Sequence, residues 1–209
     1  MVTTVGKTQI GSHIWAMNNK WSDEDYYEIY CEDITDVLTG KAKYDSTFVQ
    51  RGGVDTHMYE ISTVVKQLLK GNMNHIIGVL SPKIKTRTTA FMNLRTIARK
   101  EIARNCFHSI NGMAEGNYYK YVIQGEDRSP KKCGQILRSI QMGITILKRG
   151  KVEFKPFHDG TPDDVLELLS EMQFLYMVSG LPEQPNEDNF YLLLERMRVD
   201  QFNSHYENW

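Results

Sequence analysis

Ile10-Gly11-Ser12 and, after a short spacer, Asp23-Glu24-Asp25 are the most informative residues of this chain. In a β-strand, side chains two residues apart point to the same face, about 6 to 7 Å apart, so Asp23 and Asp25 are expected to project side by side. Two neighbouring carboxylates repel each other unless a cation lies between them, and Mg²⁺ prefers such oxygen ligands together with waters and phosphate oxygens. Gly11 lets the backbone approach a ligand closely, and Ser12 at the start of a helix leaves N–H groups facing an anion. The pattern indicates metal-dependent phosphate chemistry.

Length and composition set broad limits on the function. The chain has 209 residues, of which 41% are hydrophobic, enough for one domain with its own core and a smaller helical appendage. The formal net charge of −1 gives no overall attraction to nucleic acid, so any nucleic-acid contact has to be local. The three cysteines (Cys31, Cys106 and Cys133) are widely spaced, which argues against a disulfide framework and favours a reducing cytoplasm. No apolar run is long enough for a signal peptide or a membrane span, so no membrane partner is expected.

Residue patterns predict an α+β fold with a mixed front and a helical back. Strands are expected at residues 2–10, 25–31 and 47–54, the last one interrupted by Gly52-Gly53. Helices are expected at about residues 12–18, 56–69, 88–114, 130–148, 162–178 and 187–203, with a short extended piece at 151–157. A boundary near Ser81-Pro82 is expected to divide a catalytic core, residues 1–81, from a helical C-terminal domain, residues 82–209.

The motifs quoted above resemble the signature of the polymerase-β-like nucleotidyltransferase superfamily, which is a hydrophobic residue, Gly-Ser, a spacer and Asp-x-Asp. Two later segments, 65–82 and 130–152, are similar to an uncharacterised subgroup of bacterial, archaeal and phage predicted nucleotidyltransferases. The chain departs from the subgroup at Gln135, where a His is common, and at Glu24, where an apolar or small residue is usual. The resemblance implies a nucleotidyltransferase fold, a small mixed sheet with flanking helices, followed by a helical C-terminal region.

The resemblance also implies a third carboxylate on a neighbouring strand. Asp55 and Glu60 both lie near the expected place. Asp55 is preferred, because it follows a glycine pair at the end of an expected strand whereas Glu60 falls inside an expected helix. Asp23, Asp25 and Asp55 would then act as the catalytic residues and would hold two Mg²⁺ ions, with Mn²⁺ as an alternative.

Gly11 and Ser12 are expected to bind the triphosphate, with Lys66, Lys131 and Arg138 as its cationic complements. The expected reaction moves a nucleoside monophosphate from a nucleoside triphosphate, with ATP preferred, to a hydroxyl acceptor, and releases pyrophosphate. The acceptor stays open between a protein, a small molecule and an RNA end or second nucleotide, and a homo-oligomer is compatible with the sequence. The alternative is a non-catalytic nucleotide- or partner-binding module that retains the fold.

Overall fold

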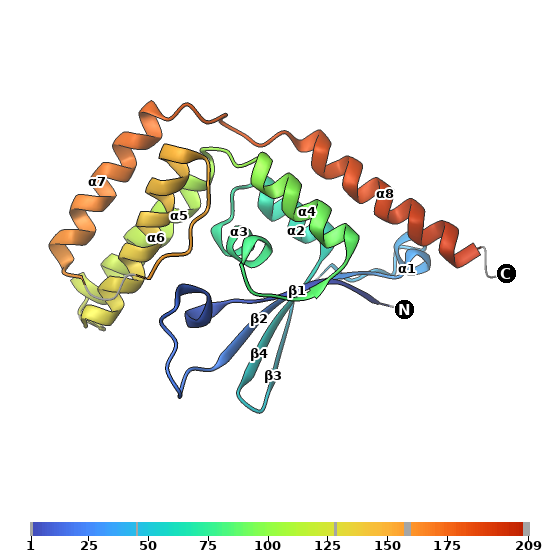
Figure 1. The fold of residues 1–209 in the computed structure, drawn as a ribbon, viewed down its shortest axis with the longest axis horizontal. Coiled ribbons are helices and arrows are strands. Elements are labelled where there is room, and N and C mark those ends of the chain that lie inside the picture. The colour runs from blue at the N-terminus through green and yellow to red at the C-terminus, as the bar shows by residue number, and fades with distance from the viewer. Residues whose placement is uncertain (1, 45, 128, 157–159, 207–209) are drawn as a thin grey trace.

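The centre of the molecule is a five-stranded mixed sheet in the order β3-β4-β2-β1-β5. The computed structural model describes residues 2–44, 46–127, 129–156 and 160–206. The strands are β1 (Thr3–Gln9), β2 (Glu24–Cys31), β3 (Thr47–Arg51), β4 (Val54–Glu60) and β5 (Ile84–Arg87). Helices accompany the sheet on one face and at one side (Figure 1), so the expected α+β fold is confirmed.

Two strand pairings position the residues of interest. β2 and β4 run parallel, and their register places Asp25 opposite Asp55. β3 and β4 form an antiparallel hairpin that turns at Gly52 and Gly53. Both glycines have positive φ, 57° and 80°, a conformation that costs glycine nothing because it has no Cβ. The strand expected at 47–54 is therefore the first arm of a hairpin, and its interruption is the turn.

Helices cover one face of the sheet and bury its apolar side chains. They are α2 (Ile61–Leu69), α3 (Met73–Leu80) and α4 (Thr89–Lys100). Val64, Phe91 and Leu94 on these helices and Ile29 on β2 are completely buried, and burial of such side chains is the main favourable term in folding. The hairpin of β3 and β4 extends beyond these helices, away from their cover (Figure 1).

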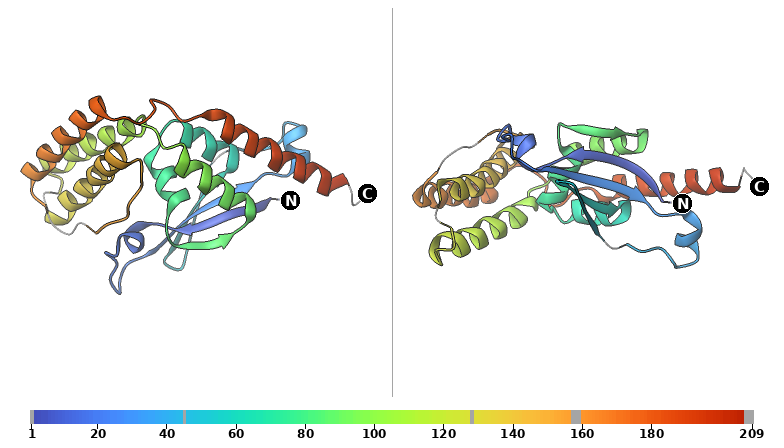
Figure 2. Two further views of the ribbon diagram at one scale, coloured as in Figure 1. Left: turned by 45° about the horizontal axis from the view of Figure 1, so that its top comes forward. Right: turned by 90° about the horizontal axis from the view of Figure 1, so that it is seen from below.

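The remaining helices form a second group beside the sheet and a long return helix (Figure 2). The group consists of α5 (Cys106–Asn117), the π-helical turn η2 (Tyr118–Ile123), α6 (Pro130–Arg149) and α7 (Pro162–Val178). The last helix, α8 (Glu187–Tyr206), crosses back over α4 and reaches the short helix α1 (Ile34–Leu38). The chain thus returns from the helical group to the sheet before it ends.

The expected helix at 56–69 is wrong in its first part. Residues 54–60 form β4, because β2 and β3 on either side supply hydrogen-bonding partners, and the helix begins at Ile61. Glu60 is therefore the last residue of a strand and the N-cap of α2, where its carboxylate accepts a hydrogen bond from the Ser62 N–H at 2.7 Å. The spacing of the apolar residues in this segment fits both a helix and a strand, and pairing with the neighbouring strands decides for the strand.

Two other expectations also differ from the structure. The single helix expected at 88–114 is two helices, α4 and α5, whereas the extended piece expected at 151–157 falls, up to residue 156, in a segment without regular secondary structure. β5 lies beyond residue 81 and pairs with β1, so the sheet includes a strand from the part that was expected to be helical. The division between residues 81 and 82 stays a prediction.

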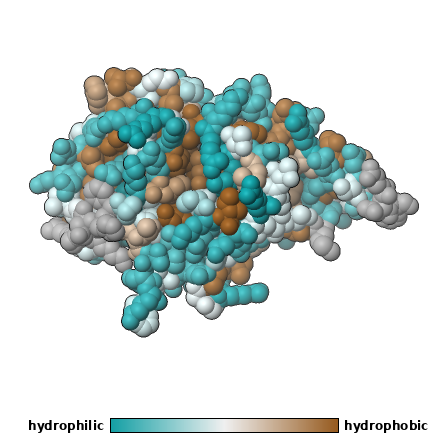
Figure 3. All heavy atoms as spheres, viewed as in Figure 1, coloured by the Kyte–Doolittle hydropathy of each residue, from teal (hydrophilic) through white to brown (hydrophobic). Residues whose placement is uncertain are grey.

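Hydrophilic side chains dominate the visible surface, and brown patches mark exposed apolar ones, for example over the end of α7 (Figure 3). Phe174, Met177 and Val178 of α7 are among these exposed residues. Within the described ranges, no helix combines the length and the apolar character that crossing a bilayer requires.

Candidate active site

Asp25 and Asp55 lie side by side near the start of two parallel strands. They are direct partners in the register of β2 and β4, whose backbones are about 4.8 Å apart in a sheet. Both residues are half-buried. Two residues further along, Tyr27 and His57 are partners, and Tyr27 contacts His75 of α3. The two carboxylates therefore belong to the helix-covered face of the sheet, at the end where β4 extends beyond the helices.

Gly11 brings the chain from β1 across Asp25. The N–H of Ile10 donates to the carbonyl of Asp25 at 2.8 Å, and Gly11 follows with φ of 68°. A Cβ built on Gly11 would collide with the carboxylate of Asp25, so this position requires glycine for both its conformation and its close approach. Ser12 follows in the short 3₁₀ helix η1 (Gly11–Trp15).

Charge and burial make this corner unfavourable for an isolated carboxylate. Burial raises the pKa of Asp25, the charges of Asp55 and Asp23 raise it further, and His57 and His13 act in the opposite direction. Asp55 Oδ1 and His13 Nε2 are both buried, and within the described residues neither has a hydrogen-bond partner. Buried polar atoms normally have partners, so a pair of orphaned atoms beside repelling carboxylates is typical of a ligand site.

The donor set fits a divalent cation that is shared with a phosphate. Mg²⁺ is usually held by one or two carboxylates together with substrate oxygens and waters, and Asp25 and Asp55 supply such a pair. In the described part of the chain, no group of three or more His, Cys, Asp or Glu side chains is arranged to hold a metal ion. Asp23, which precedes β2, is exposed and acts on Asp25 through its charge. Asp55 and Asp23 thus both lie close enough to Asp25 to act on its charge, but the three side chains do not form a complete set of metal ligands.

Glu60, the other acid considered on β4, lies at the opposite end of the strand. Its side chain is completely buried and its Oε1 is 2.5 Å from Nη2 of Arg198 in α8. Its other oxygen accepts from Ser62. Both oxygens are therefore engaged in holding α2 and α8 to the sheet, whereas Oδ1 of Asp55 has no hydrogen-bond partner in the described part of the chain.

The three cations expected near the phosphates have different positions. Arg138 of α6 contacts η1, with Nη1 2.8 Å from Met17 Sδ and the guanidinium 4.9 Å from the centre of the Trp15 ring. Burial lowers the pKa of Arg138. Lys66 is exposed on α2, which begins at the far end of β4 from the aspartates. Lys131 falls in the first turn of α6, and its side chain lies outside the described residues. Of the two cations whose side chains are described, Arg138 contacts the segment that follows Gly11 and Ser12, and Lys66 lies elsewhere.

Two histidines at the site were not selected from the sequence. His13 follows Ser12 directly, and His57 lies two residues after Asp55 on β4. The alternation of Asp55 and His57 would have placed both on one face had the segment been read as a strand. In a helix, by contrast, side chains two residues apart point to different faces. Because a helix was expected from about residue 56, His57 was not placed beside Asp55.

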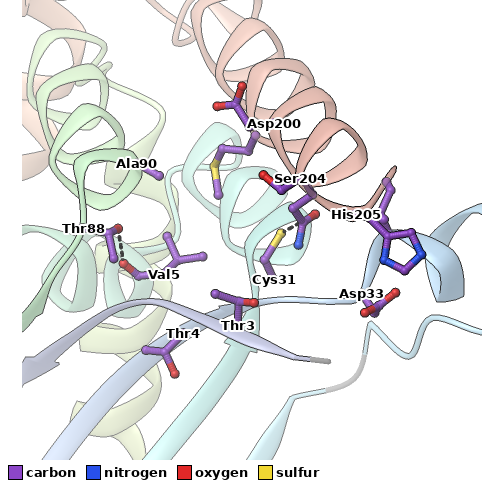
Figure 4. A pocket seen from close by; sticks show the side chains of 13 residues that line it. Thr3, Thr4, Val5, Cys31, Asp33, Thr88, Ala90, Asp200, Ser204 and His205 are labelled. Carbon is purple, nitrogen blue, oxygen red and sulfur yellow. Dashed lines mark hydrogen bonds between the residues drawn. The ribbon is translucent and has the colours of Figure 1, made fainter. Parts of the chain in front are cut away.

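The cavity drawn in Figure 4 lies elsewhere in the molecule. It has a volume of about 460 Å³ and lies between the start of β1, the end of β2 and the last turns of α8. Cys31 lines it from the end of β2, and it is separated from Asp25 by six residues of strand, about 20 Å. The cavity is therefore not a part of the aspartate site.

Of the comparisons with known proteins, the match to a family profile agrees with the sequence signature. No curated protein matches the chain at a significant level. A crystal structure of a nucleotidyltransferase-like protein from Exiguobacterium sibiricum 255-15 aligns with 97% of this chain and 71% of its own, at 13% identity and a TM-score of 0.30. So distant a likeness carries no information about function. Residues 2–197 match the profile of the family described as the RNA repair pathway DNA polymerase beta family, and that range includes every residue of the site. The chain therefore belongs to this family, within the polymerase-β-like nucleotidyltransferase superfamily.

Proposed function

We propose that this protein is a divalent-metal-dependent nucleotidyltransferase that transfers a nucleoside monophosphate from a nucleoside triphosphate to the hydroxyl end of a polynucleotide. The observation that carries the proposal is the in-register pair of Asp25 and Asp55 with Gly11 packed against it. Family membership supports nucleotidyl transfer, and the family's description as an RNA repair pathway favours RNA among the acceptors. ATP is the first donor to test.

Asp25 and Asp55, with Asp23 beside them, would hold Mg²⁺ or Mn²⁺ against the triphosphate. Bound there, two such ions would lower the pKa of the acceptor hydroxyl and offset the charge that develops at phosphorus. Gly11 and Ser12 would bind the terminal phosphates, since the backbone is open to close approach there. The unpartnered Nε2 of His13 is available to donate to a phosphate oxygen.

The transfer step needs no covalent enzyme intermediate. The acceptor oxygen forms a bond to the α-phosphorus, the bond from that phosphorus to the bridging oxygen of the β-phosphate breaks, and pyrophosphate leaves. The hydroxyl proton passes to water. The residues of the site align donor and acceptor, and holding two reactants in the correct geometry is itself a large part of catalysis.

A direct test is incubation of the protein with each triphosphate labelled at its α-phosphate, Mg²⁺ and a single-stranded oligoribonucleotide. The expected product is the oligonucleotide extended by one labelled nucleotide, and Asp25→Asn should abolish it. Label on the protein itself, or on small molecules when host lysate replaces the oligonucleotide, would instead identify another acceptor.

A non-catalytic nucleotide-binding module is the second candidate, because the described residues present a carboxylate pair and not a closed metal cluster. The two candidates differ in a simple measurement. Both predict that Mg²⁺ and a triphosphate raise the melting temperature, since a ligand that binds only the folded form stabilises it. Only the enzyme releases pyrophosphate.

A further inference from the structure

An aromatic pair on the β3–β4 hairpin lies next to the proposed metal ligands. The register of the hairpin pairs Phe48 with His57 and Gln50 with Asp55. The rings of Phe48 and His57 are in contact, with centroids 4.9 Å apart and planes tilted by 45°. Because side chains alternate along a strand, Asp55 and His57 share a face of β4, and Phe48 and Gln50 extend that face onto β3.

Packing does not account for Phe48. Its side chain is 54% exposed, and among the described residues it is not part of the hydrophobic core. β3 is an edge strand, where an exposed apolar residue invites association with other chains and is usually avoided. An exposed ring on an edge strand, held from the side by the ring of its cross-strand neighbour, is an open stacking surface.

The order of the strands indicates which substrate would use this surface. Gly11 approaches Asp25 from the side of β1, whereas Phe48 lies on the opposite side of the carboxylates, beyond β4. Neighbouring strands are about 4.8 Å apart, so Asp25 and Asp55 lie between Gly11 on one side and Phe48 on the other. In an in-line displacement the attacking and leaving oxygens lie on opposite sides of the phosphorus. If the pyrophosphate leaves on the Gly11 side, the acceptor comes from the Phe48 side.

We infer that Phe48, supported by His57, is a stacking platform for a nucleobase, and that this base belongs to the terminal nucleotide of the acceptor strand. The choice of the acceptor over the donor nucleotide rests on the function proposed above. Stacking on an aromatic side chain tolerates every base, so the platform selects a base-bearing acceptor without reading its sequence. It also gives a protein of near-zero net charge a local means of holding a single strand.

The test compares binding and transfer with two short oligoribonucleotides, one ending in adenosine and one ending in an abasic nucleotide. Phe48→Ala should weaken binding of the first oligonucleotide, measured by fluorescence anisotropy without triphosphate, by about 5-fold to 150-fold, the range of a lost base stack. It should leave binding of the abasic oligonucleotide and of ATP with Mg²⁺ unchanged. Phe48→Trp keeps a large ring and should retain the preference, and Phe174→Ala, which removes an exposed ring from α7, is the matched control.

Several results would overturn the inference. Equal binding of the two oligonucleotides by the unchanged protein, or no effect of Phe48→Ala on their difference, removes the platform. A weaker affinity for ATP in Phe48→Ala, with oligonucleotide binding unchanged, assigns the ring to the donor base and contradicts the acceptor assignment, as does transfer to a protein. The proposed function fails separately: base-dependent binding through Phe48 without any transfer would keep the platform and reject the enzyme.

Discussion

The two ends of β4 carry one acid each, and they are used in opposite ways. Glu60 is completely buried, caps α2 and pairs with Arg198, so both of its oxygens have partners within the protein. Asp55, at the other end, faces another carboxylate and has a buried oxygen without a partner in the described chain. A carboxylate whose bonds are all satisfied internally serves the fold, whereas one left unsatisfied beside a like charge is available to a ligand.

Asp55→Asn should give the largest effect on activity and little effect on the fold. The amide has the same shape but loses the charge that a divalent cation needs, and metal binding contributes several kcal/mol to transition-state stabilisation. Nucleotide transfer should fall at least about a thousandfold. Thermal unfolding of the metal-free protein should not shift downward, because removal of one of two repelling charges relieves Asp25.

A normal transfer rate in Asp55→Asn would mean that Asp55 does not bind the metal, and the contrast drawn between Asp55 and Glu60 would be wrong. Asp25→Asn is the companion variant, and it too should lose transfer while it raises the melting temperature of the metal-free protein. The sign follows from the raised pKa of Asp25: the folded state disfavours its charged form at neutral pH.

Arg198→Ala should give the largest effect on stability. It leaves Glu60 buried without its cation, and removal of one partner of a buried ion pair costs about 3 kcal/mol or more. Urea denaturation measures the loss. In the Glu60→Gln background the same substitution should cost much less, since the stranded charge is gone. Equal losses in both backgrounds would mean that the ion pair does not matter.

Between the two ends, His75 should make stability depend on pH. Burial lowers the pKa of His75 to about 4, and its Nδ1 is 2.7 Å from the hydroxyl of Tyr27. Above about pH 6.5 both states are neutral at this residue. As the pH falls below that value, His75 becomes protonated in the unfolded chain but stays neutral in the folded protein. The free energy of unfolding should therefore drop by about 2 kcal/mol between about pH 7 and pH 5.

The variant His75→Gln isolates this contribution. Whatever its stability at neutral pH, its free energy of unfolding should change less over the same interval, and urea titrations at several pH values measure the slope. A slope as steep as that of the unchanged protein would assign the pH dependence to other groups.

Arg138→Ala should have the smallest effect, because it acts on the aspartate end of the sheet indirectly. Arg138 contacts Trp15 and Met17, and no ion pair with a carboxylate is found for it among the described residues. Its loss should therefore loosen η1 and reduce transfer by about tenfold, a shift of about 1.4 kcal/mol. Arg149→Ala removes an exposed arginine of the same helix, which pairs with Glu153 at 3.4 Å, and should change neither binding nor transfer. Identical behaviour of the two variants would restrict α6 to a packing role.

Local sequence was sufficient for features that depend on a few consecutive residues. The glycine pair was predicted to interrupt a strand, and the chain does break there, because glycine adopts a positive φ readily; that the break is a hairpin turn was not predicted. The limits of α7 were predicted at residues 162 and 178 and are found there. Thr161 caps the first turn and Pro162 follows it in the first turn, and both residues favour a helix start through local geometry alone. Membership of the polymerase-β-like superfamily was also predicted, from the Gly-Ser and Asp-x-Asp motif together with two later segments, and the family match confirms it.

Pairing between distant strands could not be derived in the same way. The preference for Asp55 over Glu60 rested in part on a helix that does not exist there, because pairing with β2 and β3 makes 54–60 a strand. The same pairing brings His57 to the site. The ion pair between Glu60 and Arg198 joins residues 138 positions apart, and no local sequence pattern predicts it.

The sequence by itself thus determined the superfamily and the α+β class, and from a few neighbouring residues it predicted phosphate chemistry at the Gly-Ser and Asp-x-Asp segment. Tertiary structure alone decided which acid of β4 keeps a buried oxygen without a hydrogen-bond partner among the described residues, which histidines join it, and that Phe48 is exposed beside it. The physical reason is that burial, charge interaction and hydrogen-bond satisfaction depend on which segments meet in space, and in this protein the segments that meet are β2, β3, β4 and α8.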